Sequence, residues 1–231
     1  TNEFKKHIIM KLQKLLTLSF LMLLSSGWAS AQSNISVSLL TGTTKIDLSW
    51  TPLKAEKLSP FLGIGCHYKF NPKKHPKLAS TFGINFYQKH NVLKYPDPGF
   101  LDTGNTFYSA SKSKVSFFQF EMPLMLGYKI NKLSLYASTA VIVNTKGKNI
   151  YSYEATKDGI TKKKSSSTKV ENIEPLSLNL GLFCSYTFSK KWSAGLLYRR
   201  TMTDFYDADL SNSKSRNNTF GISLDYKIKQ L

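Results

Sequence analysis

Apolar residues recur at every second position along much of this chain. Near its end, Phe220, Ile222, Leu224, Tyr226 and Ile228 alternate with small or polar residues. Because successive side chains of a β-strand point to opposite faces, this period predicts a strand with one apolar face and one polar face. The same period returns in seven earlier segments, so we expect an all-β protein.

The eight alternating segments lie at 35–50, 61–70, 78–88, 118–130, 133–143, 176–188, 192–199 and 220–228. In the first of them, Gly42 separates two apolar sets and indicates a bulge or bend, which leaves open a single strand or a hairpin. The connections are short at 71–77, 131–132 and 189–191, intermediate at 51–59, and long at 89–114, 145–175 and 203–217. Transmembrane barrels have short turns on one side and long loops on the other, so this alternation predicts an even strand count.

The N-terminal region has the features of an export signal. Lys11 and Lys14 precede an apolar run at 15–24, and the small residues Ala-Ser-Ala follow at 29–31. The run is about half the ~20 residues that a membrane-spanning helix needs. We therefore expect 1–31 to be a cleaved signal peptide, in which 1–9 is an extension upstream of Met10, and 32–231 to be one mature domain.

The chain is strongly basic, with a formal net charge of +18. Removal of 1–31, which carries four lysines and one glutamate, leaves +15. Such a balance favours an anionic partner, whether nucleic acid, a membrane surface or lipopolysaccharide. Export excludes nucleic acid, and no later apolar run is long enough for a transmembrane helix. Outer-membrane lipids and lipopolysaccharide remain as the expected partners.

The polar faces of the segments carry several charges. A sheet in lipid must pair every backbone group, so it closes into a barrel, and at eight strands side chains fill the interior. The polar faces then point inward, and they include Glu121, Asp225, Arg199, Lys69 and Lys129. Because buried charges need partners, we expect both carboxylates to pair with these cations in a filled core. A gated path for protons or solutes is the alternative.

Aromatic residues gather toward the segment ends. Tyr68, Phe70, Tyr128, Tyr186, Phe188, Trp192 and Tyr226 lie toward the short connections, and Trp50, Phe61, Phe86, Phe118 and Tyr198 toward the long ones. Two such belts are typical of membrane barrels. A soluble, exported, lipocalin-like barrel would instead turn its apolar face inward. Alternation alone does not separate the two, but the belts and the loop lengths favour the membrane.

Two stretches resemble sequences of small outer-membrane barrels. Thr219–Tyr226 resembles the terminal signal that the barrel assembly machinery reads, although this chain continues to Leu231 and does not end on Phe. Phe120–Tyr128 is similar to the E-[IM]-P-L-x-x-x-Y strand of the outer-membrane β-barrel, PorT-like and OmpX-like families. The resemblance implies an integral outer-membrane protein of a Gram-negative cell that meets the assembly machinery during insertion.

No motif for catalysis or metal binding stands out. The chain lacks His-x-x-His, Cys-x-x-Cys and Gly-x-Ser-x-Gly, so we expect no enzyme, no catalytic, cofactor-binding or metal residues, and no cofactor. His67 is expected inside the barrel as a hydrogen-bonded residue. Cys66 and Cys184 fall on opposite walls, beyond the ~7 Å Cα separation of a disulfide, and are expected as free thiols that face lipid.

The sequence thus predicts an eight-stranded antiparallel up-and-down transmembrane β-barrel in the outer membrane, with a structural or loop-mediated binding role. Lysines of the 145–175 loop either meet lipopolysaccharide phosphates or lie in a solvated, partly disordered loop. Other functions remain open: the barrel component of a protein-secretion machinery with an envelope protein partner, a lipid-modifying enzyme that pairs His90 with Ser109 or Ser111, and the soluble binder.

Overall fold

The computed structural model describes residues 31–48, 54–55, 58–72, 75–94, 100–102, 106–145, 147–157, 160–170, 173, 175–203 and 215–230. These residues form twelve strands: β1 (Ala31–Leu48), β2 (Lys54–Ala55), β3 (Ser59–Pro72), β4 (Leu78–Lys94), β5 (Phe100–Asp102), β6 (Thr106–Ile130), β7 (Leu133–Asn144), β8 (Gly147–Lys157), β9 (Ile160–Val170), β10 (Leu176–Thr187), β11 (Trp192–Thr201) and β12 (Ser215–Gln230). In this part of the chain, no helix is long and apolar enough to cross a membrane. The expected signal peptide, 1–31, lies outside the described residues except for its last residue, Ala31.

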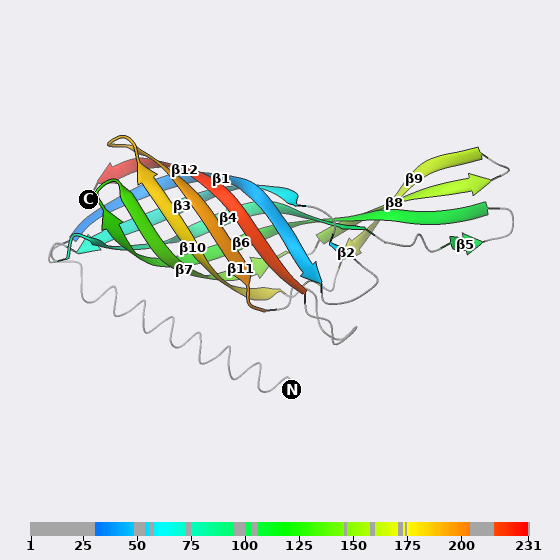
Figure 1. Ribbon diagram of the computed structural model, residues 1–231, viewed down its shortest axis with the longest axis horizontal. Coiled ribbons are helices and arrows are strands. Elements are labelled where there is room, and N and C mark those ends of the chain that lie inside the picture. The colour runs from blue at the N-terminus through cyan, green and yellow to red at the C-terminus, as the bar shows by residue number, and fades with distance from the viewer. Residues whose placement is uncertain are drawn as a thin grey trace, which may run out of the picture.

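Eight of the strands close into an antiparallel barrel (Figure 1). The order around the wall is β1, β3, β4, β6, β7, β10, β11 and β12, and β12 returns to β1 with Val37 opposite Tyr226. Each of these strands contains or overlaps one of the eight alternating segments, so the predicted fold class is confirmed. Closure gives the wall no unpaired edge, which is the condition for a sheet in lipid.

The first strand is continuous, and the bulge expected at Gly42 is absent from it. The register to both neighbours passes through Gly42 unbroken, and the shift lies between Ile35 and Ser36. The apolar residues change face along β1 because Ile46 points into the barrel and is 2% exposed, whereas Leu39 points outward and is 50% exposed. At the loop end the interior is itself apolar, which makes an inward Ile46 favourable.

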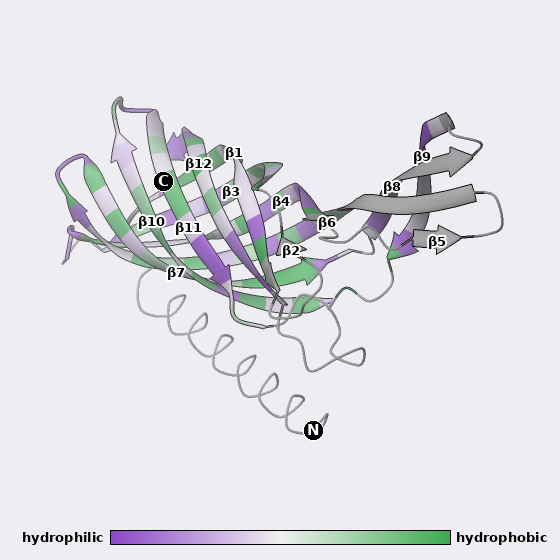
Figure 2. Ribbon diagram, turned by 45° about the vertical axis from the view of Figure 1, so that its right-hand side comes forward, coloured by the Kyte–Doolittle hydropathy of each residue, from purple (hydrophilic) through white to green (hydrophobic). Residues whose placement is uncertain are grey.

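The outer surface of the barrel is an apolar belt, and Figure 2 shows the matching alternation of hydrophobic and hydrophilic residues along the wall strands. On β6, alternate residues from Phe118 to Ile130 point outward, and Glu121 and Met125 between them are buried. This stretch covers about 40 Å of strand, which at the usual tilt of ~45° gives roughly 28 Å of thickness. A hydrocarbon core is ~30 Å thick, so the belt matches a bilayer.

Aromatic pairs mark both margins of this belt. Trp192 packs on Tyr226 near the short turns, with ring centroids 4.8 Å apart, and Tyr198 packs on Phe220 near the long connections at the same separation. The assignment of Phe61 to the outer belt is wrong. Its position along β3 suits the belt, but its face is the inner one, and it is 3% exposed. Trp50, also assigned to the belt, lies outside the described residues.

A finger of β-structure projects beyond the barrel (Figure 1). It comprises β5, residues 106–116 of β6, β8 and β9. Beyond Gln119 the partner of β6 changes from β7 to β8, and β9 pairs only with β8 among the described strands. The two longest predicted loops, 89–114 and 145–175, therefore contain strands. In the second of these, the sequence of β9 lacks the alternation because side chains on both of its faces are exposed.

At Gly42, strands β1 and β12 lie too close together to leave room for a side chain. A Cβ at Gly42 would lie 2.1 Å from the carbonyl oxygen of Phe220 and 2.9 Å from the ring of Phe61. We expect Gly42→Ala to destabilise the barrel by roughly 1–3 kcal/mol, the usual cost of overpacking. The measurement is the heating temperature at which the folded barrel, which migrates faster than the unfolded chain in a denaturing gel, changes to the mobility of the unfolded chain. Thr43→Ala, on the outer side of the same strand, is the control, and equal temperatures for both variants would contradict this packing.

Candidate functional site: the filled interior and the base of the finger

A buried ion pair spans the interior of the barrel. Glu121 of β6 contacts Arg199 of β11, and both residues are at most 3% exposed. The same guanidinium donates to the hydroxyl of Tyr87 on β4, at 3.2 Å. The predicted inward position of both residues is confirmed, and so is the expectation that Glu121 pairs with one of the inward cations, which is Arg199.

Hydrogen bonds extend from this pair toward the short-turn end. The Asn85 amide donates to Glu121 Oε2 at 3.5 Å, and its Oδ1 accepts from Nε2 of His67 at 2.8 Å. On the other side of the ring, His67 Nδ1 lies 2.9 Å from Ser38 Oγ. The expectation that His67 is a hydrogen-bonded interior residue is confirmed.

The chain of contacts ends at a second ion pair. The Ser38 hydroxyl donates to Asp225 Oδ1, and Lys69 Nζ lies 3.8 Å from Asp225 Oδ2. We call the whole set the polar chain; it comprises Tyr87, Arg199, Glu121, Asn85, His67, Ser38, Asp225 and Lys69. Because its members come from β11, β6, β4, β3, β1 and β12, it ties six of the eight wall strands together. Lys129, the fifth charge predicted to point inward, is not enclosed in the lumen with the other four. It lies exposed at the short-turn mouth of the barrel.

Lys89 is an interior cation that the sequence did not reveal, because it stands at the start of a predicted loop. It is 4% exposed and lies over the rings of Phe61 and Tyr87, with centroid distances of 5.6 and 5.1 Å. Its Nζ also donates to Thr219 at 3.4 Å. The extension of β4 to Lys94 brings this lysine into the barrel.

Apolar clusters fill the lumen above and below these charges. At the loop end, Ile46, Val115, Phe117 and Ile173 pack together, and a second cluster toward the short turns comprises Ala79, Met125, Tyr136, Phe183 and Leu197. A third cluster joins Leu40 to Phe61 and Tyr87. The interior is thus packed in layers, and this packing favours the filled core over a conducting path.

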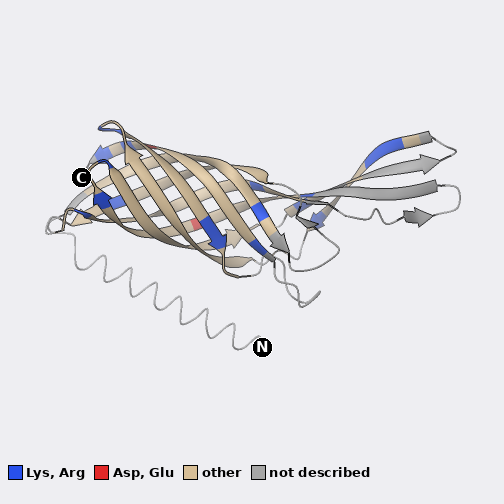
Figure 3. Cartoon of the chain, in the orientation of Figure 1, with Lys and Arg blue, Asp and Glu red and all other residues tan. Residues whose placement is uncertain are grey.

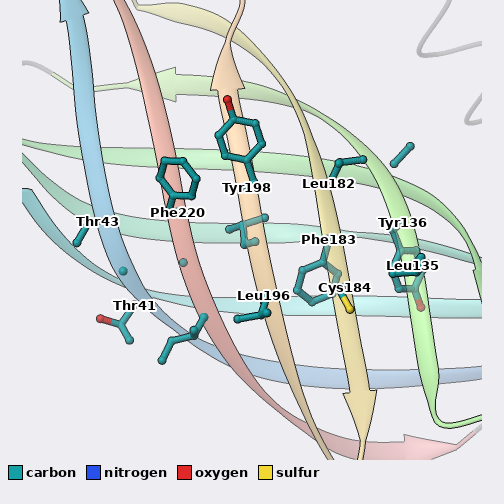
Figure 4. A pocket seen from close by; sticks show the side chains of 15 residues that line it. Thr41, Thr43, Leu135, Tyr136, Leu182, Phe183, Cys184, Leu196, Tyr198 and Phe220 are labelled. Atoms are coloured by element: carbon teal, nitrogen blue, oxygen red, sulfur yellow. The ribbon is translucent and has the colours of Figure 1, made fainter. Parts of the chain in front are cut away.

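The lipid-facing wall has an apolar hollow of about 920 Å³, shown in Figure 4. Leu182, Leu196 and Phe220 stand around it, and Gly42 and Gly221 also line it. Cys184 also lines the hollow, and both Cys66 and Cys184 are free, as expected. The hollow faces the same medium as the belt, so acyl chains are its natural filling.

A row of polar side chains crosses the outer face at the base of the finger. Backbone register places His90 opposite Ser116, Ser116 opposite Lys148, and Lys148 opposite Lys169. His90 Nδ1 lies 2.8 Å from Ser116 Oγ. The predicted serine partners of His90 are therefore not the ones found, since Ser109 pairs with Phe100 and Glu154 farther along the finger. The register that selects Ser116 is not visible in the sequence.

The charge beside His90 does not suit a catalytic base. Burial and the ammonium group of Lys114 both lower the pKa of His90, which lies above the belt. A serine hydrolase instead needs a carboxylate that stabilises the imidazolium formed when histidine takes the serine proton. Among the described residues, no group of three or more His, Cys, Asp or Glu forms a candidate metal site.

No protein-family model matches the sequence, and no curated protein matches it. Among solved structures, the fold is similar to Ail, the attachment invasion locus protein of Yersinia pestis, at 14% identity over 86% of this chain and 99% of that one, with a TM-score of 0.43. It is also similar to Neisserial surface protein A, at 9% identity over 85% and 99%, with a TM-score of 0.44. A major outer membrane protein from Thermus thermophilus matches at 13% identity over 85% and 99%, with a TM-score of 0.38.

What decides the architecture is the closed sheet with its apolar belt and inward charges. It is an outer-membrane β-barrel. In such barrels the short turns face the periplasm and the long connections face the exterior. This places both ends of the barrel sheet on the periplasmic side and the finger outside. Charged residues accordingly gather toward the two ends of the barrel and on β9, as Figure 3 shows.

The ion pair at the centre of the polar chain gives a direct stability test. Glu121→Leu leaves Arg199 buried without its carboxylate, and breaking a buried pair in this way typically costs about 3–5 kcal/mol. We expect that loss in urea unfolding of the refolded barrel in lipid vesicles. The double variant Glu121→Leu/Arg199→Leu removes both charges and is expected to recover most of the stability. A single variant as stable as the parent would contradict the pairing.

Proposed function

We propose that this integral outer-membrane barrel is a structural surface protein that binds lipopolysaccharide through its finger. The observation that carries the proposal is the exposure of Lys162, Lys163 and Lys164 on β9, at the outer end of the molecule. A filled interior leaves the outside of the protein as the place where a ligand can meet it. A non-catalytic role is part of the same proposal.

The arrangement of β9 suits a long polyanion. Neighbouring residues of a strand point to opposite faces, so Lys162 and Lys164 share one face of the finger and Lys163 lies on the other. Lysine near an anionic surface contributes about 1 kcal/mol per charge, and the attraction weakens as salt is added. The finger therefore presents cations on both of its faces, and phosphates of lipopolysaccharide cores can bind to either face.

The C-terminal strand supports a further part of the proposal, a partner during insertion. Thr219–Tyr226 lies within β12, which forms the seam with β1. We propose that the barrel assembly machinery recognises this stretch before closure.

A secretion role is a second proposal, supported by the motif Phe120–Tyr128. This stretch lies in the wall, and its Glu121 is the partner of Arg199. Some PorT-like barrels serve protein secretion, and in this second role the protein would be the barrel component of such a machinery. Pull-down from detergent extracts tests it: a stoichiometric envelope protein partner supports this role, and recovery of the barrel alone contradicts it.

The finger lysines test the main proposal. Lys162→Ser/Lys163→Ser/Lys164→Ser removes three charges, and at about 1 kcal/mol each we expect roughly a hundredfold weaker binding of purified lipopolysaccharide. The protein is held in phosphatidylcholine nanodiscs, and binding is measured by surface plasmon resonance at low and high salt. The matched control, Lys190→Ser/Lys191→Ser/Lys227→Ser, removes three charges at the periplasmic end. Equal losses in both variants would show only a net-charge effect and would contradict binding by the finger.

A further inference from the structure

We propose that the row at the base of the finger is a binding site for the phosphate group of an outer-leaflet lipid. The site consists of Lys148 and Lys169, with Ser116 held by His90, on the lipid-facing side of the structure. The inference uses the extracellular placement of the finger, on which the proposed function also rests, but it does not depend on the lysines at 162–164.

The side chains of this row share one face. Lys148 is exposed between the buried residues Gly147 and Asn149, and Ser116 lies between the buried residues Val115 and Phe117. Because side chains alternate along each strand, the exposed members of β6 and β8 project from the same side of the sheet. Four adjacent strands, β4, β6, β8 and β9, thus each contribute one polar side chain at a single level.

A hollow of about 380 Å³ lies beside the row. Its polar lining comprises Gln88, Ser116, Lys148 and Lys169, and no carboxylate is among its described lining residues. Ammonium, amide and hydroxyl groups all donate hydrogen bonds to phosphate oxygens, and two ammonium groups match the charge of a phosphate ester. The bond between His90 and Ser116 fixes the serine at the edge of this hollow.

The height of the hollow indicates a lipid rather than a free anion. Phe118 also lines the hollow. It is the lipid-facing residue of the β6 belt nearest the finger, and it lies two positions from Ser116 on the same face of the strand. Phe86 stacks on Phe118 with centroids 5.4 Å apart, and Phe120 continues the apolar surface below. A ligand here meets cations at one end and aromatic rings at the other. That combination fits a phosphate headgroup with its acyl chains lying along the belt.

Lys114 adds a third cation above the site. It lies opposite Val92, two residues farther along β6 from the membrane than Ser116, and its charge lowers the pKa of His90. An anion seated between Lys148 and Lys169 is therefore also attracted from the side of β6. Lys148 and Lys169 line the hollow at the level of Ser116, and Lys114 stands farther from the membrane, so the phosphate is held at headgroup level.

The test compares two pairs of lysines on the same finger. Lys148→Gln/Lys169→Gln alters the proposed site, and Lys162→Gln/Lys164→Gln removes equal charge farther out on β9. The detergent-solubilised, refolded full-length barrel is titrated with dioctanoyl phosphatidic acid, dioctanoyl phosphatidylcholine and inorganic phosphate, and binding is followed by calorimetry. We expect saturable binding of phosphatidic acid, weakened at least tenfold by the first variant and less than threefold by the second.

Three results would overturn the proposal. Equal affinity of the parent and the Lys148→Gln/Lys169→Gln variant would exclude the site, and equal weakening by both variants would reduce it to net charge. Binding of inorganic phosphate as tightly as phosphatidic acid would exclude the lipid. If the double variant does not show the gel mobility of the folded barrel, Lys169→Gln alone, on exposed β9, replaces it with the same expected direction. Loss of lipopolysaccharide binding in the outer variant, with phosphatidic acid binding intact, separates this site from the finger tip.

Discussion

The rest of the structure depends on the hydrogen-bonded seam between β1 and β12. A bilayer offers no water to unpaired backbone groups, so a sheet in lipid is stable only when its first and last strands meet. Once Val37 lies opposite Tyr226, every wall residue is assigned to lipid or to the lumen by its parity. A slip of one residue would place Asp225 in lipid and an apolar neighbour inside, so the seam and the polar chain stabilise the same register.

Closure also explains why the interior charges form a chain. Eight strands leave a narrow lumen in which a lone carboxylate is strongly unfavourable. Glu121 is neutralised by Arg199 and Asp225 by Lys69, and His67 lies between the two pairs through Asn85 and Ser38. The barrel thereby replaces water with its own polar groups, and the sites that are open to ligands lie on the outside.

The wall was predictable from the sequence because each of its faces meets one medium. In the wall part of β6, from Phe118 to Ile130, the even-numbered residues face lipid and the odd ones face the lumen, so a period of two appears directly in the chain. Phe61 shows the limit of position along a strand as a guide, since its face and not its height decides where the ring lies. That Glu121 and Asp225 each pair with an inward cation followed from the cost of burying a charge. Which cation pairs with each carboxylate became known only from the fold.

The finger and its base were not predictable in the same way. Both faces of β9 meet water, so its residues have no reason to alternate, and the tract reads as a loop. The row of His90, Ser116, Lys148 and Lys169 exists only through the register of four strands whose residues are up to 79 positions apart in the sequence. Spacing along the chain favoured Ser109 and Ser111 because it contains no information on how β4 pairs with β6.

The central claim is that one face of the wall meets lipid and the other a filled lumen. It is tested most directly by spin labels placed singly at residues 117–126 of β6 in the refolded barrel in phospholipid vesicles, with accessibility to oxygen and to a polar nickel complex measured by electron paramagnetic resonance. The account predicts high oxygen accessibility at even positions, low accessibility to both reagents at odd positions, and a strict period of two. Accessibility of the odd positions to the nickel complex would show a water-filled lumen and would contradict the account, as would the loss of the period.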